Sequence, residues 1–285
     1  MSVSLTESYA HCRRVARRRA RNFYYAFVLL ARQQREAMSA IYAFMRRADD
    51  LSDEPGAAAA ALERWREELE AALEGRYRGH PLWPAFHDTV QRYHIPRGHF
   101  FELLEGVGSD LEPRRVATFE ELYRYCYQVA SVAGLAVLHV LGFRSQEALP
   151  LAEKCGVAFQ LTNILRDLKE DAERGRVYVP AEDLERFQVT PWERTPAFLE
   201  LLRFEAARAR RYYLESRPLL ELVEPAGRRC LWVLIEIYRR LLERVERAGY
   251  GVLDRRVTLP AWEKWWVVVR GLASGRATVL AGSVV

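Results

Sequence analysis

Cysteine is scarce in this chain, which has four cysteines in 285 residues and no Cys-x-x-Cys pair. The four are Cys12, Cys126, Cys155 and Cys230, far apart in the sequence. This spacing argues against a structural zinc site and against a disulfide framework. A reduced compartment such as the cytoplasm is therefore the expected setting.

Apolar runs long enough to span a membrane are also lacking. Residues 1–21 carry arginines where a secretory signal would have its apolar centre. Arg270 and Arg276 interrupt the apolar C-terminal tail before it reaches spanning length. The segment "WEKWWVVVR", residues 262–270, predicts an amphipathic closing helix whose aromatic side chains are able to rest on a membrane. We expect a cytoplasmic protein, and we leave open a peripheral contact with the inner face of the cell membrane.

Several familiar motifs are absent as well. The six histidines include no Glu-x-x-His or His-Glu-x-x-His spacing, which argues against di-iron bundles and zinc proteases. The net charge of +5 allows an anionic partner. However, the arginine cluster in residues 13–21 has no interleaved aromatic residues, so we interpret it as a solvated helix face and expect no nucleic-acid partner. A role near anionic lipid or an incoming diphosphate is the less favoured alternative.

What the chain does contain is helical periodicity. Apolar residues recur at three- and four-residue spacing in almost every long segment, which predicts an all-α fold. Hydrophobic residues make up 50% of the chain, enough for a sizeable core. We expect one domain spanning residues 1–285, with about eight to ten helices around a central space. The expected helices lie near residues 23–54, 57–75, 85–94, 97–106, 117–143, 146–175, 197–217, 218–223 and 228–248.

The segment "YAFMRRADDLSDE", residues 42–54, crowds acidic residues onto the end of one predicted helix. Asp49 and Asp53 are four residues apart, so they share one helix face and are separated by about 6 Å along the axis. Asp50 adds to their mutual repulsion. Arg46 lies one turn earlier and is positioned to offset part of that charge.

A second segment, "QLTNILRDLKEDAERGRVY", residues 160–178, repeats the pattern. Asn163, Asp167 and Asp171 are four apart, and Gln160 precedes Asn163 by three. They share one face of the predicted helix, beside apolar leucine and isoleucine positions. A single Asp-x-x-x-Asp step is common on a solvated helix face. Two such steps inside apolar helices favour a ligand site instead.

Two rows of carboxylate and amide oxygens suit Mg²⁺, with Mn²⁺ as an alternative ion. Mg²⁺ prefers carboxylates together with water and substrate phosphates over a cage made only of protein atoms. Arginines accompany both rows, and guanidinium groups bind phosphate oxygens in pairs. The sequence therefore predicts a site for magnesium and a diphosphate.

These two segments resemble the aspartate-rich signatures of the squalene and phytoene synthase family. "YRYCYQVASVAG", residues 123–134, is similar to the segment that lies between those signatures in the family. The resemblance extends from about residue 20 to residue 270. It implies an all-α isoprenoid synthase fold and head-to-head joining of two identical allylic prenyl diphosphates.

The resemblance also implies roles for individual residues. The implied metal ligands are Asp49, Asp53, Asn163, Asp167 and Asp171. Tyr125 matches a tyrosine that manages the proton lost when a cyclopropane closes. The implied substrate-binding residues are Tyr42, Arg46, Gln160, Asn163, Arg176, Tyr238 and Arg256. Apolar pocket walls are expected among Phe23, Phe27, Phe44, Val129, Val132, Ala133, Leu135, Phe159 and Leu161, most of which suit an ordinary core equally well.

The main prediction is a prenyltransferase that condenses two farnesyl diphosphates to presqualene diphosphate and onward to squalene. NADPH is a candidate cofactor if squalene is the product, and its use is left open. The close alternative joins two geranylgeranyl diphosphates to phytoene, or forms dehydrosqualene. A non-enzymatic assembly factor is less favoured because both acidic segments are intact, and a terpene cyclase would need different spacing in the second segment. The oligomeric state is left open.

Overall fold

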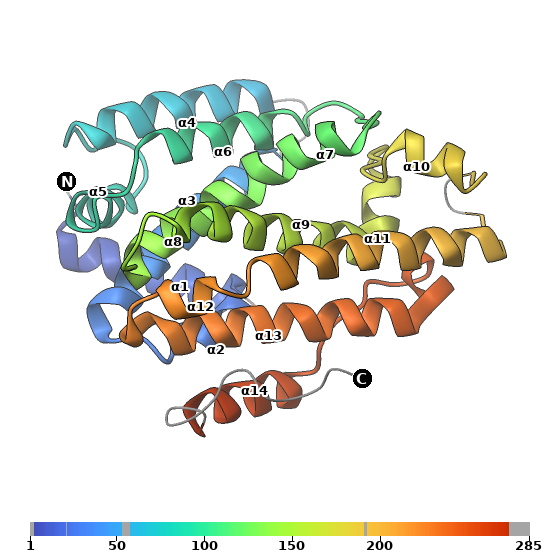
Figure 1. The fold of residues 1–285 in the computed structure, drawn as a ribbon. Coiled ribbons are helices and arrows are strands. Elements are labelled where there is room, and N and C mark those ends of the chain that lie inside the picture. The colour runs from blue at the N-terminus through green and yellow to red at the C-terminus, as the bar shows by residue number, and fades with distance from the viewer. Residues whose placement is uncertain (1–2, 21, 53–57, 191–192, 274–285) are drawn as a thin grey trace.

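A computed structural model describes residues 3–20, 22–52, 58–190 and 193–273, and these residues form an all-α fold (Figure 1). This part of the chain contains two isolated β-bridges and no β-strand. The all-α prediction is confirmed. The elements are α1 (Leu5–Arg19), α2 (Phe23–Phe27), α3 (Arg32–Ser52), α4 (Ala58–Leu73), α5 (Trp83–Arg92), α6 (Gly98–Gly108), α7 (Phe119–Cys126), the π-helical turn η1 (Tyr127–Ser131), α8 (Val132–Leu141), α9 (Ala148–Glu173), α10 (Ala181–Arg186), α11 (Pro196–Glu215), α12 (Leu219–Leu222), α13 (Pro225–Ala248), the 3₁₀ turn η2 (Gly249–Leu253) and α14 (Ala261–Ala273).

The described residues form fourteen α-helices, more than the predicted eight to ten. Residues 23–54, predicted to form one or two helices, contain α2 and α3, and the single helix predicted at 117–143 is divided by η1. Periodicity does not reveal such interruptions, because the apolar face continues through them. The amphipathic closing helix is present as α14.

Local sequence signals explain several helix ends. The Thr118 hydroxyl accepts a hydrogen bond from the Glu121 backbone N–H at 3.3 Å, which makes Thr118 the cap of α7. The Glu121 carboxylate accepts from the backbone N–H of Ala117, at 2.9 Å, rather than from that of Thr118. Gly75 and Gly142 follow α4 and α8 with φ of 80° each, in the left-handed region that favours glycine.

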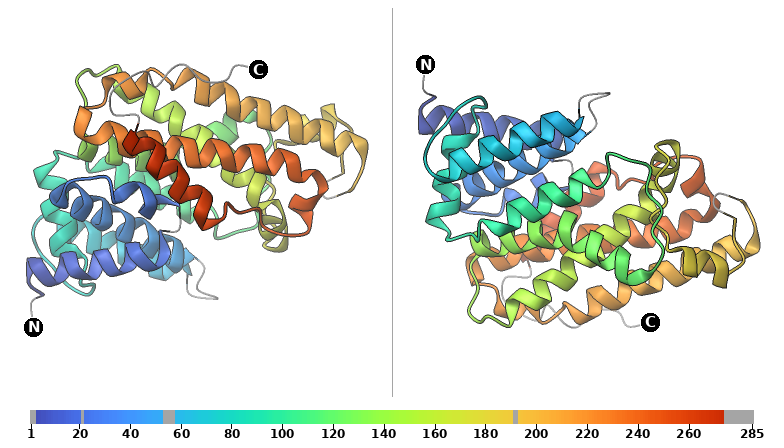
Figure 2. Two further views of the ribbon diagram at one scale, coloured as in Figure 1. Left: turned by 90° about the horizontal axis from the view of Figure 1, so that it is seen from below. Right: turned by 90° about the horizontal axis from the view of Figure 1, so that it is seen from above.

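Helix α9 lies near the centre of the molecule and packs against α8, α11 and α13 (Figures 1 and 2). With 26 residues it is about 39 Å long. Gly156 on α9 approaches η1 closely, since a Cβ atom there would lie 2.5 Å from the Cα of Ser131. The Ser131 hydroxyl also donates to the Glu153 carbonyl at 2.8 Å. These contacts fix α9 against the chain segment that follows Tyr125.

Aromatic rings fill the core between α3, α4, α5 and α6. Phe44 stacks on Phe86 with centroids 4.7 Å apart and meets the edge of Phe100 at 5.4 Å. Trp65 and Trp83 extend the cluster, with centroids 4.3 Å apart. Burial stabilises the fold by about 2 kcal/mol for a phenylalanine. Phe44 has no exposed surface, so it belongs to this core.

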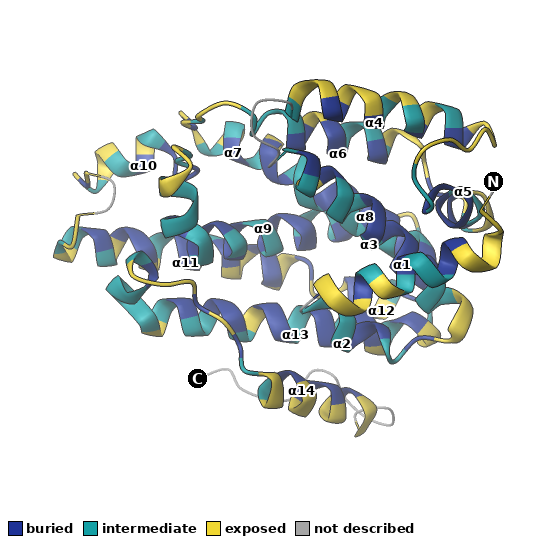
Figure 3. Cartoon of the chain, turned by 180° about the vertical axis from the view of Figure 1, so that it is seen from behind, coloured by how far each residue is buried: buried dark blue, intermediate teal, exposed yellow. Residues whose placement is uncertain are grey.

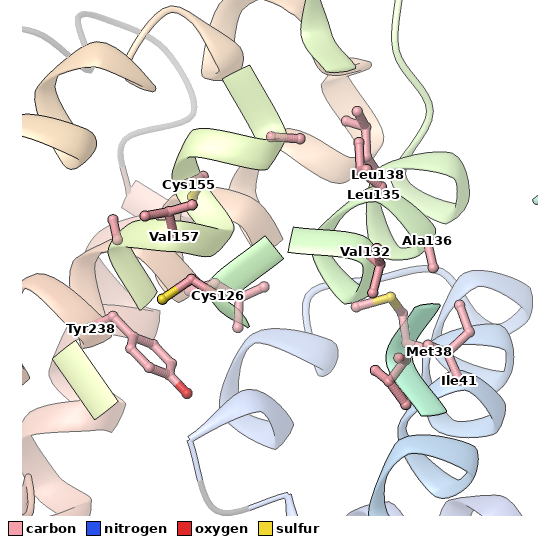
Figure 4. Packing of buried hydrophobic residues seen from close by; sticks show 14 of the residues in the cluster. Met38, Ile41, Cys126, Val132, Leu135, Ala136, Leu138, Cys155, Val157 and Tyr238 are labelled. Carbon is pink, nitrogen blue, oxygen red and sulfur yellow. The ribbon is translucent and has the colours of Figure 1, made fainter. Parts of the chain in front are cut away.

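Helix α8 connects the two helices that carry the acidic segments. It packs against both α3 and α9. Figure 4 shows Met38 and Ile41 of α3 beside Val132 of α8. Helix α13 packs against α9 and against α2, the short helix that precedes α3. The acidic segments are thus held in defined positions by apolar packing.

All four cysteines are free and buried. Burial raises the pKa of the Cys12 and Cys155 thiols to about 12, so they are weak nucleophiles. None of the described helices combines the length and the apolar character needed to cross a bilayer.

Candidate active site

The second acidic segment lies on α9, where Asp167 is bound by two arginines. Arg166 Nε donates to Asp167 Oδ1 at 2.7 Å, and Arg256 Nε lies 2.9 Å from the same oxygen. The side chains of Arg166 and Asp167 are only 11% and 14% exposed. We call this face of α9, which carries Asp167, the α9 wall. The structure places Arg256 beside it, although Arg256 lies 89 residues from Asp167 in the sequence.

Asn163 and Gln160 lie one and two turns earlier on the same helix. Asn163 Nδ2 donates to Gln160 Oε1 at 3.3 Å. Asn163 Oδ1 is buried and has no hydrogen-bond partner among the described residues, and the Asn163 side chain lies close to that of Tyr238. The Tyr238 ring stacks on Phe159 with centroids 4.2 Å apart, which fixes its position. A buried acceptor without a donor costs about 1–3 kcal/mol, so this oxygen is available to a ligand.

Asp171 continues the row toward the end of α9. Burial raises the pKa of its carboxyl group to about 7, and the neighbouring Asp167 carboxylate acts in the same direction. The Arg176 guanidinium opposes both effects. Arg176 Nη2 also donates to the backbone carbonyl of Asp110 at 2.6 Å, which anchors it to the loop before α7. Two neighbouring acids on a partly buried face are an arrangement that a divalent cation would stabilise.

Tyr125 belongs to a hydrogen-bonded group with Asp110 and Tyr178. The Tyr125 hydroxyl donates to Asp110 Oδ2 and the Tyr178 hydroxyl to Asp110 Oδ1, each at 2.7 Å. The two rings stack with centroids 4.7 Å apart. Burial raises the pKa of Asp110 and holds the pKa of the Tyr125 phenol well above its usual value. The carboxyl group is therefore a stronger proton acceptor than an exposed aspartate.

Loop pairing places this group beside α9. A parallel β-bridge joins Arg115 to Val177, so the loop that carries Asp110 lies along the chain that follows α9. The Arg114 guanidinium lies over the Tyr125 ring, 4.8 Å from its centroid. Tyr125 and the end of the second acidic segment thus share one region of the molecule.

The first acidic segment forms the last turns of α3, which ends at Ser52, and we call this end of the helix the α3 wall. Asp49 is exposed, whereas Asp50 is half-buried, pairs with Arg46 and lies 3.8 Å from Arg19. Arg46 Nε is buried and has no hydrogen-bond partner within the described parts of the chain. Asp53 lies outside the described residues, so its role as a metal ligand stays a prediction.

Aromatic rings connect the two acidic walls. Phe23 of α2 lies 6.2 Å from the Tyr42 ring on α3 and 5.7 Å from the Tyr238 ring on α13, measured between centroids. Burial raises the pKa of Tyr42 to about 12, and Asp49 and Tyr238 contribute in the same direction. The structure therefore brings Tyr42 and Tyr238 together; their contact with substrate stays a prediction.

The donor set suits a magnesium ion that is shared with a substrate. Within the described ranges, no three His, Cys, Asp or Glu side chains converge closely enough to hold a metal ion by themselves. Mg²⁺ does not need such a cage, because one or two carboxylates, water and phosphate oxygens complete its coordination. The open acceptor on Asn163 and the adjacent acids Asp167 and Asp171 meet that requirement.

Comparison with known proteins agrees with this chemistry. Residues 16–263 match the family model described as Squalene/phytoene synthase. The chain belongs to the squalene/phytoene synthase family. Members of this family are prenyltransferases that join prenyl diphosphates head to head with a divalent metal ion as cofactor, and this chain is accordingly a prenyltransferase.

Similar relatives and structures cover nearly the whole chain. A phytoene synthase from Arthrospira platensis is 35% identical, with 96% of this chain and 95% of the relative covered. A 15-cis-phytoene synthase from Synechococcus elongatus is also 35% identical, with coverage of 98% and 96%. The crystal structure of a dehydrosqualene synthase with ligand superimposes with a TM-score of 0.88 at 30% identity, covering 94% of this chain and 96% of the other. The squalene synthase HpnC from Alicyclobacillus acidocaldarius gives 0.80 at 31%, with coverage of 88% and 97%.

The predicted site residues do not include Asp110, Arg166, Tyr178 or Arg19, which also lie in this region. Tyr178 shares Asp110 with Tyr125, and Arg19 lies beside Asp50. Tyr178 follows Arg176 by two positions in the second segment, which was an available signal. Arg19 is one of many arginines in α1, so nothing in its local sequence distinguishes it.

Proposed function

We propose that this chain joins two molecules of geranylgeranyl diphosphate head to head to form phytoene. The observation that carries the proposal is the 35% identity to phytoene synthases along 96–98% of the chain. The dehydrosqualene and squalene synthases share 30% and 31% identity with it. The condensation of two farnesyl diphosphates is therefore the second candidate.

In this proposal the two acidic walls bind the diphosphate groups. Asp49 on α3, together with the following Asp53, serves one of the groups. Asp167 and Asp171 serve the other from α9, and Asn163 contributes its open Oδ1 atom. Bound magnesium neutralises the charge that develops on a departing diphosphate. The carboxylates hold both diphosphates at the same polar end.

Arginines supply fixed donors for the diphosphate oxygens. Arg46 keeps a buried Nε–H that has no partner in the described chain. Arg256 lies on the exposed side of Asp167, where its guanidinium is able to contact Asp167 and a phosphate together. Arg176 is held by the Asp110 carbonyl, so little ordering is required when it binds. Such pre-positioned charges stabilise the leaving group during ionisation.

Tyr125 and Asp110 handle the proton that is released when the cyclopropane closes. Loss of diphosphate from an allylic carbon leaves a delocalised carbocation, and ring closure expels one proton. The Tyr125 oxygen accepts that proton while its own proton moves to Asp110 Oδ2, 2.7 Å away. The raised pKa of Asp110 makes this acceptor effective. Tyr178 keeps the second carboxyl oxygen bonded throughout.

Half-buried apolar side chains exclude water from the cation. Val129 on η1, Ala133 on α8 and Phe159 on α9 are neither fully buried nor exposed. Together with Phe23 on α2, they are the predicted wall residues that keep some accessible apolar surface. Water would quench an allylic cation, so these positions protect the intermediate.

We also propose that α14 rests on a membrane surface. Trp262, Trp265 and Trp266 are 70%, 49% and 44% exposed, and Val269 and Leu272 continue the same exposed face (Figure 3). Tryptophan favours the boundary between lipid and water, and a hydrocarbon product needs an apolar destination. Replacing Trp262 and Trp266 with serine should abolish sedimentation with phosphatidylcholine vesicles. Unchanged sedimentation of that variant would contradict this contact.

One incubation tests the proposed reaction. The protein, Mg²⁺ and either farnesyl or geranylgeranyl diphosphate are combined, with and without NADPH, and the hydrocarbons are identified by mass spectrometry. We expect a forty-carbon product from geranylgeranyl diphosphate that does not depend on NADPH. A thirty-carbon product formed only from farnesyl diphosphate would establish the second candidate instead.

A further inference from the structure

A basic pocket of about 600 Å³ lies between α1 and α3. Its charged lining consists of Arg13, Arg14, Arg17, Arg32, Arg35 and Glu36, which we call the arginine pocket. The first three arginines come from the cluster that the sequence predicts to be a solvated helix face. Because two further arginines of α3 face them across a concavity, this part of the cluster forms a pocket rather than a flat surface.

The charges of the arginine pocket are not balanced within the protein. Arg13 Nη1 lies 2.7 Å from Glu36 Oε1, and Arg32 Nε lies 3.3 Å from the same oxygen. The only carboxylate of the lining is thus shared by two arginines. Arg14, Arg17 and Arg35 have no ion pair with any residue in the described ranges. Five arginines and one glutamate leave the lining with an excess of four positive charges.

The arginine pocket is separate from the acidic walls. Arg35 precedes Asp49 by 14 residues on α3, which corresponds to about 21 Å along the helix. The two sites also differ in chemistry. The acidic walls need a cation before they can bind a diphosphate, whereas the pocket already carries the opposite charge to a phosphate.

We propose that the arginine pocket is a second anion site, which binds a phosphate or diphosphate group without a divalent metal ion. Planar guanidinium groups bind phosphate oxygens in pairs, and the pocket offers them from two helices. Ser39 fixes part of this geometry, because its hydroxyl donates to the Arg35 carbonyl at 2.7 Å and it is only 3% exposed. The arginines of the pocket are partly or fully exposed, so salt screens their charges and anion binding should weaken as the ionic strength rises.

The phosphate group has two sources, a soluble molecule or the headgroup of an anionic lipid. The second source is relevant because α2 connects the pocket to α14. Tyr24 lines the pocket, and the next residue, Tyr25, packs against Trp265 with ring centroids 5.2 Å apart. Figure 2 shows α14 on the same side of the molecule as α1 and α2 when seen from below. A membrane that met the tryptophans of α14 would lie near the pocket.

The test compares neighbouring arginines on α1. Arg17 lines the pocket, whereas Arg18 is also exposed but is not part of its lining. Arg17→Gln and Arg18→Gln change the net charge by the same amount. Binding of inorganic diphosphate is measured by calorimetry with EDTA present, so that no divalent ion is available. We expect Arg17→Gln and Arg35→Gln to weaken binding about tenfold each, and Arg18→Gln by less than about twofold.

A vesicle arm separates the two sources. Sedimentation with vesicles of phosphatidylcholine and phosphatidic acid is compared with that of phosphatidylcholine alone. If Arg17→Gln loses the preference for phosphatidic acid and Arg18→Gln keeps it, the pocket binds a lipid headgroup. If Arg17→Gln weakens only the binding of diphosphate, and Arg18→Gln does not, the pocket binds a soluble ligand. Failure of both ligands to bind without metal, or equal effects of Arg17→Gln and Arg18→Gln, would overturn the proposal. Turnover of prenyl diphosphates should stay at the wild-type level in Arg17→Gln, so this result is independent of the proposed reaction.

Discussion

The two acidic walls have the same spacing of aspartates but different surroundings. On α9, Asp167 is 14% exposed and lies between two arginines, and Asp171 is buried enough for its pKa to rise. On α3, Asp49 is exposed, and its neighbour Asp50 is half-buried and pairs with Arg46. The α9 wall is thus built into the fold, whereas the α3 wall presents its first aspartate to solvent. The same motif is therefore partly buried on α9 and begins at an exposed position on α3.

The largest expected effect is on turnover, and it should be common to both walls. Asp49→Asn and Asp167→Asn each remove one charge from a proposed magnesium ligand. Loss of one charge-stabilising contact in a transition state costs about 10²–10³ in rate, and we expect a decrease of that size in each variant. Turnover of geranylgeranyl diphosphate with Mg²⁺ is the measurement.

Two observations accompany that comparison. Helical content by circular dichroism should be unchanged in both variants, since neither aspartate is part of the hydrophobic core. Wild-type turnover in either variant would remove its wall from the proposed site. Asp50→Asn is a useful contrast. Asp50 already pairs with Arg46, so we expect its substitution to lower the turnover rate less than Asp49→Asn does.

Tyr125→Phe should impair the step that follows ionisation of the substrate. Its effect should therefore differ from that of the aspartate variants of either wall. The variant keeps the stacked ring but loses the hydroxyl that donates to Asp110. We expect a decrease of about 10² in hydrocarbon formation, within the range of general acid–base effects. Release of diphosphate should decrease less than hydrocarbon formation. Tyr178→Phe is the matched control, and an unaltered product profile in Tyr125→Phe would exclude the proposed role.

The sequence could predict the fold class and the row of oxygens along α9 because both depend on local spacing. Four-residue steps fix which side chains share a helix face, whatever the helix packs against. The pairing of Arg256 with Asp167 could not be predicted in this way, because the two are 89 residues apart. The interruption at η1 and the burial of Phe44 in the aromatic core also depend on tertiary packing. The two walls differ in how deeply their aspartates are buried. That depth depends on how the whole chain packs, so local spacing does not predict it.

The next effect concerns stability and should differ between the walls. Asp167→Asn leaves the buried Arg166 without its charged partner, so we expect the free energy of unfolding to decrease by about 2 kcal/mol. Asp49→Asn should change it by less than about 0.5 kcal/mol, because Asp49 is exposed. Urea unfolding of both variants measures the difference. Equal destabilisation would show that the contrast in burial has no energetic consequence.

A third charged cluster, which contains none of the predicted site residues, sharpens the comparison. Arg208 Nη1 lies 2.7 Å from Asp183 Oδ2 and 2.8 Å from Glu205 Oε1, and both carboxylates are about as buried as any in the described chain. Burial raises the pKa of Glu205 to about 8. The folded protein therefore holds this proton more tightly than the unfolded chain does. That contribution to stability is complete below the ordinary pKa and is lost as the pH rises through about 8.

The smallest expected effect follows from this titration. Between about pH 5 and pH 8 the wild-type protein should lose at least about 1 kcal/mol of unfolding free energy through Glu205. Glu205→Gln is neutral throughout that range, so its stability should depend less on pH, measured by urea unfolding at both ends. Its turnover should equal that of the wild type, unlike that of Asp167→Asn. If Glu205→Gln keeps the wild-type pH slope, the Glu205 carboxyl group is ionised in the folded protein and the expected titration is wrong.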